Sequence, residues 1–473
     1  MKVEQIYTGC LAQGAYYIES EGEVAIVDPL REVEPYIKKA EAEGARIKYV
    51  LETHFHADFV SGHLDLTRKT GAEIVFGPNA APSFPIPAAK DGEILSLGNI
   101  KIKVLHTPGH TMESTCYLLI DEEGKEKALF SGDTLFIGDV GRPDLAQKVK
   151  AELTEDILAG HLYDSLRNKI MPLADDIIVY PAHGAGSACG KKMSKETTDT
   201  LGHQKRTNYA LDTALSKERF KAVVLEGLVA PPGYFPLNVL MNIQGYDSID
   251  KVLERGQHAL SPEAFEAAAN ETSALILDTR KAEHFAKGFI PNSINIGIDG
   301  NFAPWVGTMI PDIKQEILLV TEEGREEEAV VRLARVGYDF TIGYLKGGFD
   351  AWKNAAKEVD HIEQVTPDQL ASIITTDPHS HILDVRKHSE FSSEHLLDVI
   401  NTPLDFINES MAQIDKSRKH YVHCAGGYRS MIFISILKAR GFDNLVDIKG
   451  GFNAIKESGK FTISDYVSPT TML

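Results

Sequence analysis

The residues best suited to chemistry are six histidines and aspartates, the last three of which stand directly beside a glycine. They are His54, His56 and Asp58 within residues 53–59 (THFHADF), followed by His110, Asp133 and His183. Neither helical nor strand periodicity points three side chains of a five-residue stretch at one ion, so the first group is expected on a loop. Imidazole and carboxylate ligands suit zinc or iron. A lone histidine is usually structural, but the set as a whole predicts a metal site.

A second reactive group lies far along the chain, in residues 421–430 (YVHCAGGYRS). An apolar strand leads to Cys424, a glycine-rich turn follows, and a helix is expected from about Ser430. Backbone N–H groups of such a turn, aided by the helix N-terminus, stabilise an anion and lower a thiol pKa. Cys424 is therefore a candidate nucleophile, with Arg429 beside it.

Strands are expected to position the metal ligands. Residues 24–27 read as a buried strand and residues 32–43 as a helix that stops at Gly44. The ligand groups directly follow the apolar runs 48–51, 102–105, 128–130 and 177–180. Side chains at strand ends can converge while a rigid sheet fixes their spacing.

The second half contains an internal repeat. Residues 274–280 (ALILDTR) match 381–386 (HILDVR), and 345–352 (LKGGFDAW) match 448–454 (IKGGFNA). Each copy, about 100 residues long, alternates strands and helices, which indicates a largely parallel sheet covered by helices on both faces. The predicted domains are 1–245, 246–360 and 361–473. Aligning Arg325 with Arg429 places Val320 opposite Cys424, so the first copy is expected to be inactive.

Composition narrows the partners. Lys and Arg number 49 against 68 Asp and Glu, a net charge of −19, which argues against nucleic acid or an anionic membrane as the main partner. The chain begins without a signal-like apolar run and has no stretch of about 18 apolar residues. Its four cysteines form no CxxC pair, so a cytoplasmic location is expected. Cys10 and Cys116 are predicted on core strands.

The metal motifs resemble those of the metallo-β-lactamase superfamily. The resemblance lies in the Thr-His-x-His-x-Asp, Thr-Pro-Gly-His and Ser-Gly-Asp segments and in the final histidine. The resemblance implies an αββα sandwich with the site at one edge of its two sheets. In two-metal members such as glyoxalase II, the aspartate corresponding to Asp133 bridges both metals and a histidine stands where this chain has Phe59. Phenylalanine cannot ligate a metal, so one metal is expected.

The resemblance is to the persulfide dioxygenase branch in particular. It implies a facial triad of His54, His110 and Asp133 around one Fe(II) per chain, for which zinc could substitute. The remaining members of the set become supporting residues or alternative ligands: His56, Asp58 and His183. In residues 141–144 (GRPD), Arg142 is expected to orient a loop or substrate carboxylate, or else to form a surface salt bridge. Cys189 is a candidate sulfur acceptor, although a small loop residue is the slightly favoured interpretation.

The repeated domains resemble rhodanese sulfurtransferases, in which the cysteine of a six-residue loop carries a persulfide. The whole order of domains is similar to the persulfide dioxygenase–rhodanese fusions of bacterial sulfide detoxification. The implied reactions are oxidation of a thiol persulfide by O₂ to sulfite and thiol, then transfer of sulfur from a Cys424 persulfide to sulfite, giving thiosulfate. The expected partners are a persulfide of glutathione, coenzyme A, bacillithiol or a similar thiol, together with O₂ and sulfite. A homodimer or homotetramer is expected.

Two alternatives remain open. One is a zinc-dependent thioester hydrolase of glyoxalase II type, fused to a sulfurtransferase and using the same ligands. The other is a non-catalytic persulfide carrier or sensor with a structural metal, which is disfavoured because structural zinc sites are usually closed and rich in cysteine.

Overall fold

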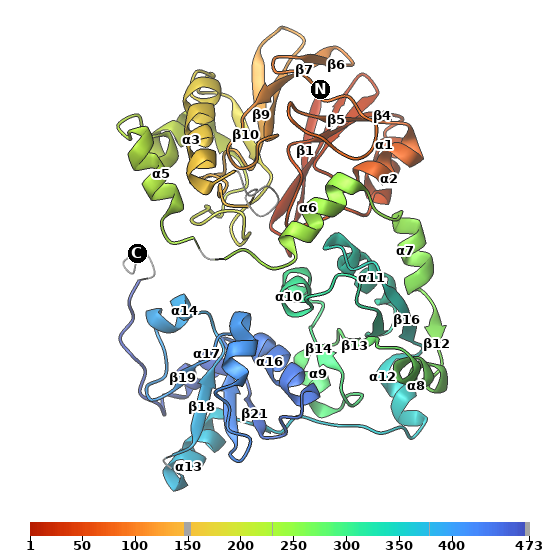
Figure 1. Ribbon diagram of the computed structural model, residues 1–473, viewed down its shortest axis with the longest axis vertical. Helices are drawn as coiled ribbons and strands as arrows, with labels where there is room; N and C mark the ends of the chain where they lie inside the picture. The colour runs from red at the N-terminus through yellow and green to blue at the C-terminus, as the bar shows by residue number, and fades with distance from the viewer. Residues whose placement is uncertain (146–152, 229, 378, 469–473) are drawn as a thin grey trace. The chain divides into compact units, whose positions relative to one another are not determined.

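The computed structural model describes residues 1–145, 153–228, 230–377 and 379–468 (Figure 1). The chain forms two compact units. One comprises Met1–Lys251 and the short segment Leu333–Asp339, and the other comprises Val252–Arg332 and the chain from Phe340 onward. None of the described helices is both long and apolar enough to cross a membrane.

The first unit contains two sheets. One sheet has the order β1 (Lys2–Thr8), β2 (Gln13–Ser20), β3 (Glu23–Val27), β4 (Arg46–Glu52) and β5 (Glu73–Phe76). Strands β1 to β3 are antiparallel, whereas β3, β4 and β5 are parallel. The parallel strands are connected through α1 (Glu34–Ala42) and α2 (His63–Thr70), as crossover connections require.

The second sheet has six strands. In spatial order they are β11 (Asp199–Thr200), β10 (Ile178–Pro181), β9 (Glu126–Gly132), β8 (Thr115–Ile120), β7 (Ile100–His106) and β6 (Ile94–Leu97). Only β9 and β10 are parallel, and the chain between them forms α3 (Glu155–Ser165) and a π-helical turn, Leu166–Ile170. The helices that follow this sheet are α4 (Leu201–Thr207), the 3₁₀ turn Tyr209–Leu211, α5 (Lys217–Leu225), α6 (Phe235–Gln244) and α7 (Ile249–Gly256).

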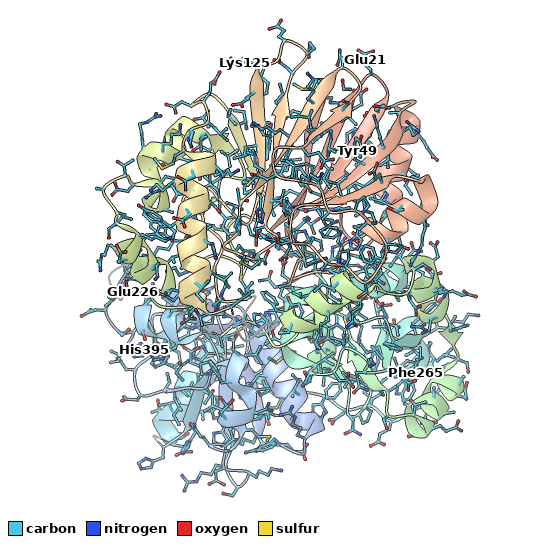
Figure 2. All side chains as sticks on the ribbon, turned by 45° about the horizontal axis from the view of Figure 1, so that its top comes forward. Glu21, Tyr49, Lys125, Glu226, Phe265 and His395 are labelled. Carbon is cyan, nitrogen blue, oxygen red and sulfur yellow. The ribbon has the colours of Figure 1, made fainter. Side chains whose placement is uncertain are left out.

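Alternation along the strands gives each sheet two apolar faces. On β2, Tyr16 packs between the sheets, and the next residue, Tyr17, packs on the α1 side. On β8, Tyr117 joins the core between the sheets while Leu118 packs with residues of α3 and α5. Tyr49 of β4, labelled in Figure 2, packs against the central core. Helices therefore cover the outer face of each sheet, and the predicted αββα sandwich is confirmed.

The second unit contains two five-stranded parallel sheets with the same topology. The first copy has the order β12 (Ala259–Leu260), β16 (Thr341–Leu345), β15 (Ile317–Val320), β13 (Leu275–Asp278) and β14 (Ile294–Asn295). The second has β17 (Gln364–Val365), β21 (Leu445–Ile448), β20 (His420–His423), β18 (His381–Asp384) and β19 (Ile400–Asn401). All the strand pairs in both sheets are parallel.

Helices connect these strands in both copies. In the first copy they are α8 (Pro262–Glu271), α9 (Ala282–Lys287), α10 (Phe302–Met309), α11 (Glu326–Arg335) and α12 (Gly348–Asn354). In the second they are α13 (Pro367–Thr376), α14 (His388–Ser393), the 3₁₀ turn Leu404–Phe406, α15 (Ile407–Met411), α16 (Tyr428–Ala439) and α17 (Gly451–Ser458). Phe265 of α8, labelled in Figure 2, is fully buried in the core of the first copy.

The repeated Asp-x-Arg motif has one structural role in both copies. The buried aspartate at the end of β13 or β18 pairs with the arginine two residues later, Asp278 with Arg280 and Asp384 with Arg386, at 2.5 and 2.6 Å between Nη2 and Oδ2. A buried carboxylate needs such a partner. The predicted pair of parallel α/β copies is therefore confirmed.

The strand register corrects one predicted alignment. Asp278 lies opposite Val320 on the neighbouring strand, and the equivalent Asp384 lies opposite His423. The residue equivalent to Cys424 is therefore Thr321, not Val320, because the helix that follows Cys424 begins one residue earlier relative to its strand. Threonine also lacks a thiol, so the first copy still has no persulfide-forming residue at this position.

Two cysteine predictions have different outcomes. Cys116 lies on β8 and is buried, as expected. Cys10 is not on a core strand: it lies in the turn between β1 and β2 and is only partly buried.

Candidate metal centre and sulfur-transfer site

Loops at the ends of four strands bring the predicted metal ligands together. His54 follows β4, His110 follows β7 and Asp133 follows β9, and their ligand atoms all lie within 4.8 Å of one another. Asp133 Oδ2 is 3.3 Å from His110 Nε2 and 3.8 Å from His54 Nε2. All three side chains are buried, so the loop segment 53–62 and the strand ends hold them at one point.

Hydrogen bonds fix which nitrogen of each imidazole faces this point. The Nδ1 of His110 lies 2.8 Å from the carbonyl oxygen of Arg142, so it carries the proton and leaves Nε2 toward Asp133. Thr53 Oγ1 donates to Asp28 and therefore accepts from Nδ1 of His54 at 3.0 Å. Partners of this kind orient metal-binding histidines and raise their basicity.

The electrostatic environment of His54 favours the neutral imidazole, the form that can bind a metal. Burial, reinforced by the neighbouring imidazoles of His56, His110 and His183, holds its pKa well below the usual value. A neutral imidazole has the free lone pair that metal binding requires.

A second potential ligand set shares Asp133. His183, which follows β10, has its Nε2 at 3.6 Å from Asp133 Oδ1 and 3.5 Å from Asp58 Oδ2. Both ring nitrogens of His183 and both carboxylate oxygens of Asp133 are buried without a hydrogen-bond partner. Buried polar atoms are nearly always satisfied, so this group of orphaned ligand atoms fits a bound cation.

His56 lies beside His54, with 4.2 Å between ring centroids, and directs one ring nitrogen toward two other carboxylates. Its Nε2 lies 3.0 Å from Asp28 Oδ1 and 3.5 Å from Glu52 Oε2. Although burial opposes protonation, Asp28 and Glu52 raise the pKa of His56 to about 9. Burial raises the pKa of Glu52 to about 8. His56 is therefore held by carboxylates, although one of its ring nitrogens also lies within 4.8 Å of ligand atoms of Asp58 and His183.

Phe59 closes this side of the site. It is fully buried, and its ring stacks on His56 with 4.3 Å between centroids and 28° between planes. The position that could supply another nitrogen ligand is thus filled by an apolar ring packed against the histidine.

Asn242 of helix α6 fixes the loop that carries these residues. Its Nδ2 donates to the carbonyl oxygens of His56 and Phe59 at 2.8 and 2.9 Å, and its Oδ1 accepts from the Ser61 amide at 2.9 Å. The side chain is buried. Sequence analysis missed Asn242 because it lies about 180 residues from the motif, on a segment treated only as a domain boundary.

The structure gives Arg142 and Cys189 definite positions. Arg142 forms two hydrogen bonds of 2.6 Å to the carboxylate of Asp144, and both side chains are buried. The expected pairing with a loop carboxylate is therefore present, and it is not a surface salt bridge. The Arg142 amide donates to the Cys189 carbonyl, and the Cys189 sulfur lies within 4.8 Å of ligand atoms of Asp133 and His183. Burial and nearby carboxylates raise the pKa of the Cys189 thiol well above its usual value.

The candidate sulfur-transfer site is the turn after β20. The Gly427 amide donates to Cys424 Sγ at 3.1 Å, and helix α16 begins at the next residue. Gly427 has a φ of 104°, a conformation that glycine adopts readily. The predicted arrangement of strand, cysteine, glycine turn and helix N-terminus is therefore present, although the helix begins at Tyr428 rather than near Ser430.

Arg429 has a partner outside this turn. Its guanidinium pairs with Glu390 of α14 through two hydrogen bonds of 2.5 and 2.8 Å. This bidentate pair ties the start of α16 to α14. A direct catalytic role for Arg429 stays a prediction.

Comparison with known proteins agrees with this architecture. The metallo-beta-lactamase superfamily matches residues 8–183, and the rhodanese-like domain matches residues 261–355 and 366–458. The chain is 30% identical to the hydroxyacylglutathione hydrolase GloC of Haemophilus influenzae over 235 residues, which are 45% of this chain and 99% of that protein. It is 31% identical to a hydroxyacylglutathione hydrolase of a Polaromonas species over 39% of this chain and 66% of that one.

A crystal structure of a metallo-beta-lactamase from Staphylococcus aureus is also similar. Its TM-score is 0.64 at 33% identity, and the match covers 73% of this chain and 99% of that one. Together with the sandwich, the buried His/Asp clusters and the two parallel copies, these matches show that the chain belongs to the metallo-β-lactamase superfamily and carries two rhodanese-like domains after its metal-binding domain.

Proposed function

We propose that the metal domain is a persulfide dioxygenase that binds one Fe(II) through His54, His110 and Asp133. The observation that carries this proposal is Phe59, stacked on a His56 that faces Asp28 and Glu52. His54, His110 and Asp133 then form a set of two histidines and one carboxylate, which is typical of non-haem iron oxygenases. The rhodanese-like domains support the same substrate class, because they handle sulfane sulfur.

The overall reaction consumes one persulfide, one O₂ and one water and yields one thiol and one sulfite with its protons. Bound Fe(II) would supply the redox chemistry that oxidises the terminal sulfur. The chain's own groups orient and shield: Thr53 and the Arg142 carbonyl hold the two imidazoles, while Phe59 covers one side of the site. Cys189 is buried, and its sulfur lies within 4.8 Å of ligand atoms of Asp133 and His183, so its thiol can donate a weak hydrogen bond to an anionic sulfur at this site.

The second reaction uses Cys424. Its thiolate attacks the outer sulfur of a persulfide, the carrier leaves as a thiolate, and Cys424 becomes a persulfide. Sulfite then attacks the outer sulfur of the Cys424 persulfide. The S–S bond breaks, thiosulfate leaves, and the Cys424 thiolate is restored. The amide of Gly427 stabilises the anionic sulfur in both steps.

A thioester hydrolase is the second candidate. It is favoured by the hydroxyacylglutathione hydrolase relatives and by the set formed by Asp58, His183 and Asp133, which could hold a second ion. In that reading a metal-bound hydroxide would be the nucleophile.

Metal analysis combined with two assays separates the candidates. One sample of full-length protein is analysed for iron and zinc, for O₂ uptake with glutathione and coenzyme A persulfides, and for cleavage of S-lactoylglutathione. Iron with persulfide-dependent O₂ uptake is expected. Zinc with thioester cleavage and no O₂ uptake would establish the hydrolase instead.

A further inference from the structure

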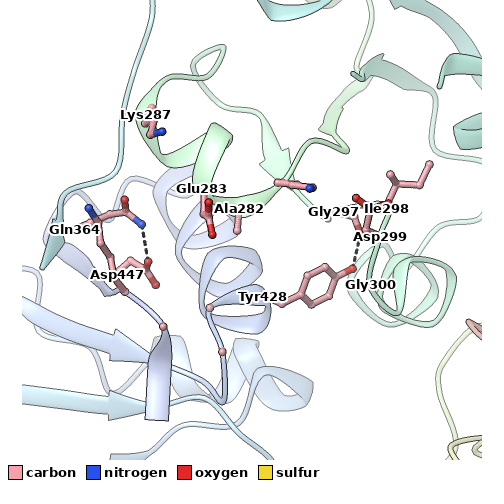
Figure 3. Close-up of a pocket in the computed structure, with 15 residues that line it drawn as sticks. Ala282, Glu283, Lys287, Gly297, Ile298, Asp299, Gly300, Gln364, Tyr428 and Asp447 are labelled. Carbon is pink, nitrogen blue, oxygen red and sulfur yellow. Dashed lines mark hydrogen bonds between the residues drawn. The ribbon is translucent and has the colours of Figure 1, made fainter. Parts of the chain in front are cut away.

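A cavity of about 600 Å³ lies within the second unit, between its two copies (Figure 3). The second copy contributes the turn glycines Gly426 and Gly427, which follow Cys424, while the first copy contributes α9 and residues 297–300. Sulfite and thiosulfate are only a few atoms across, whereas pockets of 300–1,000 Å³ are typical of organic ligands. The cavity is therefore larger than the inorganic sulfur substrates need.

The charged groups that line this cavity are unevenly paired. Among the described residues, no hydrogen-bond or ion-pair partner lies at the ammonium groups of Lys281, Lys287 and Lys449. Of the three acids in the lining, Asp299 pairs with Arg325 at 2.7 Å, and Asp447 accepts hydrogen bonds from Gln364 and Ser430. Hydrogen bonds from the neutral Gln364 and Ser430 leave the charge of Asp447 in place, and Lys449 interacts with it electrostatically. With Asp299 neutralised by Arg325, the three lysines therefore face two acids, Glu283 and Asp447, and one cation is in excess. In a chain of net charge −19, this local excess of cations favours an anionic ligand.

The two walls of the cavity are fixed to each other at the catalytic turn. Tyr428, the residue after Gly427, donates to the carbonyl oxygen of Gly297 at 2.7 Å (Figure 3). A Cβ atom on Gly300 would lie 2.4 Å from the Tyr428 ring, so this glycine makes room for it. The amide of Asn295 also donates to Ser435 of α16 at 2.9 Å. The lysine-bearing wall is therefore held in place beside the turn that carries Cys424.

We propose that the first copy, which lacks the thiol, supplies the binding wall that selects the sulfur donor of Cys424. The ligand class is a thiol persulfide whose carrier bears several negative charges, as phosphates or carboxylates, which Lys281 and Lys287 bind while its sulfur reaches the Cys424 turn. This inference rests on sulfur transfer at Cys424. The step itself needs no further reactant, because the carrier leaves as the thiolate when its outer sulfur passes to Cys424.

The test is donor selectivity in the full-length protein. Thiosulfate formation is measured without O₂, with added sulfite and three donors: coenzyme A persulfide, glutathione persulfide and the uncharged 2-hydroxyethyl persulfide. The double variant Lys281→Gln/Lys287→Gln is compared with wild type and with Lys314→Gln, an exposed lysine of the same copy outside the cavity lining. Excluding O₂ prevents the metal centre from consuming the donors.

The double variant is expected to lower kcat/KM for at least one charged donor by about tenfold, with the uncharged donor within about twofold of wild type. A loss confined to coenzyme A persulfide identifies phosphate as the bound group, and a loss confined to glutathione persulfide identifies carboxylate. Raising the salt concentration should reproduce the loss in wild type and have little effect on the double variant.

Equal effects on all three donors, or none, would overturn this inference while sulfur transfer itself stood. Failure of the wild type to form thiosulfate from any donor would instead overturn the function assigned to Cys424. Lys314→Gln is expected to match wild type with every donor.

Discussion

Asn242 offers a way to disturb the metal centre without touching a ligand. Replacing it with alanine removes three buried hydrogen bonds to the loop that carries the metal motif, two donated to carbonyl oxygens and one accepted from the Ser61 amide. Each buried backbone group left unpaired costs about 1–3 kcal/mol. Because water can enter the space left by the side chain, we expect a total loss of about 3–5 kcal/mol, concentrated in this loop.

The expected functional effect is weaker metal binding. Removing a group that orients metal ligands typically lowers metal affinity about 10- to 100-fold. Competition with a chelator measures the affinity, and hydrogen exchange of the loop amides, that of Ser61 above all, measures the local opening. Both should change together in Asn242→Ala.

Asn238 provides the matched control, since it lies one turn earlier on α6 and is fully buried. Its side-chain nitrogen and oxygen have no hydrogen-bond partner, so Asn238→Ala removes packing alone and should leave metal affinity near wild type. Wild-type affinity and exchange in Asn242→Ala would refute the reasoning. An equal loss in Asn238→Ala would show that helix packing, not the hydrogen bonds, holds the loop.

Three further predictions concern other groups. His110→Ala should lose bound iron and persulfide-dependent O₂ uptake together, and full iron occupancy in that variant would mean that the ligand set is wrong. Cys424→Ser should abolish thiosulfate formation while sulfite release continues, because the two reactions use separate sites; unchanged thiosulfate output would contradict the assignment. Burial lowers the pKa of His63 in the folded protein to about 3. As the pH falls from about 6.5 toward 3, the unfolded protein therefore binds a proton at His63 that the folded protein does not, and stability is lost. Between pH 6.5 and 5, His63→Phe should lose about 1–2 kcal/mol less stability than wild type; equal losses in calorimetry would remove His63 from the acid response.

The strands that precede the metal ligands were predictable because their sequence signals are local. Apolar runs such as residues 48–51 mark buried strands, and each ligand group follows one directly. The repeat was equally visible, since the same Asp-x-Arg pair stabilises the same strand end in both copies. These features depend on a few neighbouring residues, so the sequence alone reveals them.

The supporting groups were harder to predict because they come from distant segments. Asp28 holds His56 and Thr53 from the end of a different strand, and its one local signal was an acid directly after a buried run. Asn242 gave no signal at all. The alignment error at Val320 has a similar cause, because the relation of a turn to its strand depends on pairing with β13, which the sequence does not display.

The central claim concerns oxygen chemistry at a site of two histidines and one carboxylate. Its most direct test is the stoichiometry of O₂ consumed to sulfite released by iron-loaded full-length protein given a thiol persulfide, with Cys424→Ser included so that sulfite is not converted to thiosulfate. A dioxygenase should consume one O₂ per sulfite released, at a rate proportional to bound iron. Sulfite release without O₂ uptake, or no turnover of persulfide by iron-loaded protein, would contradict it.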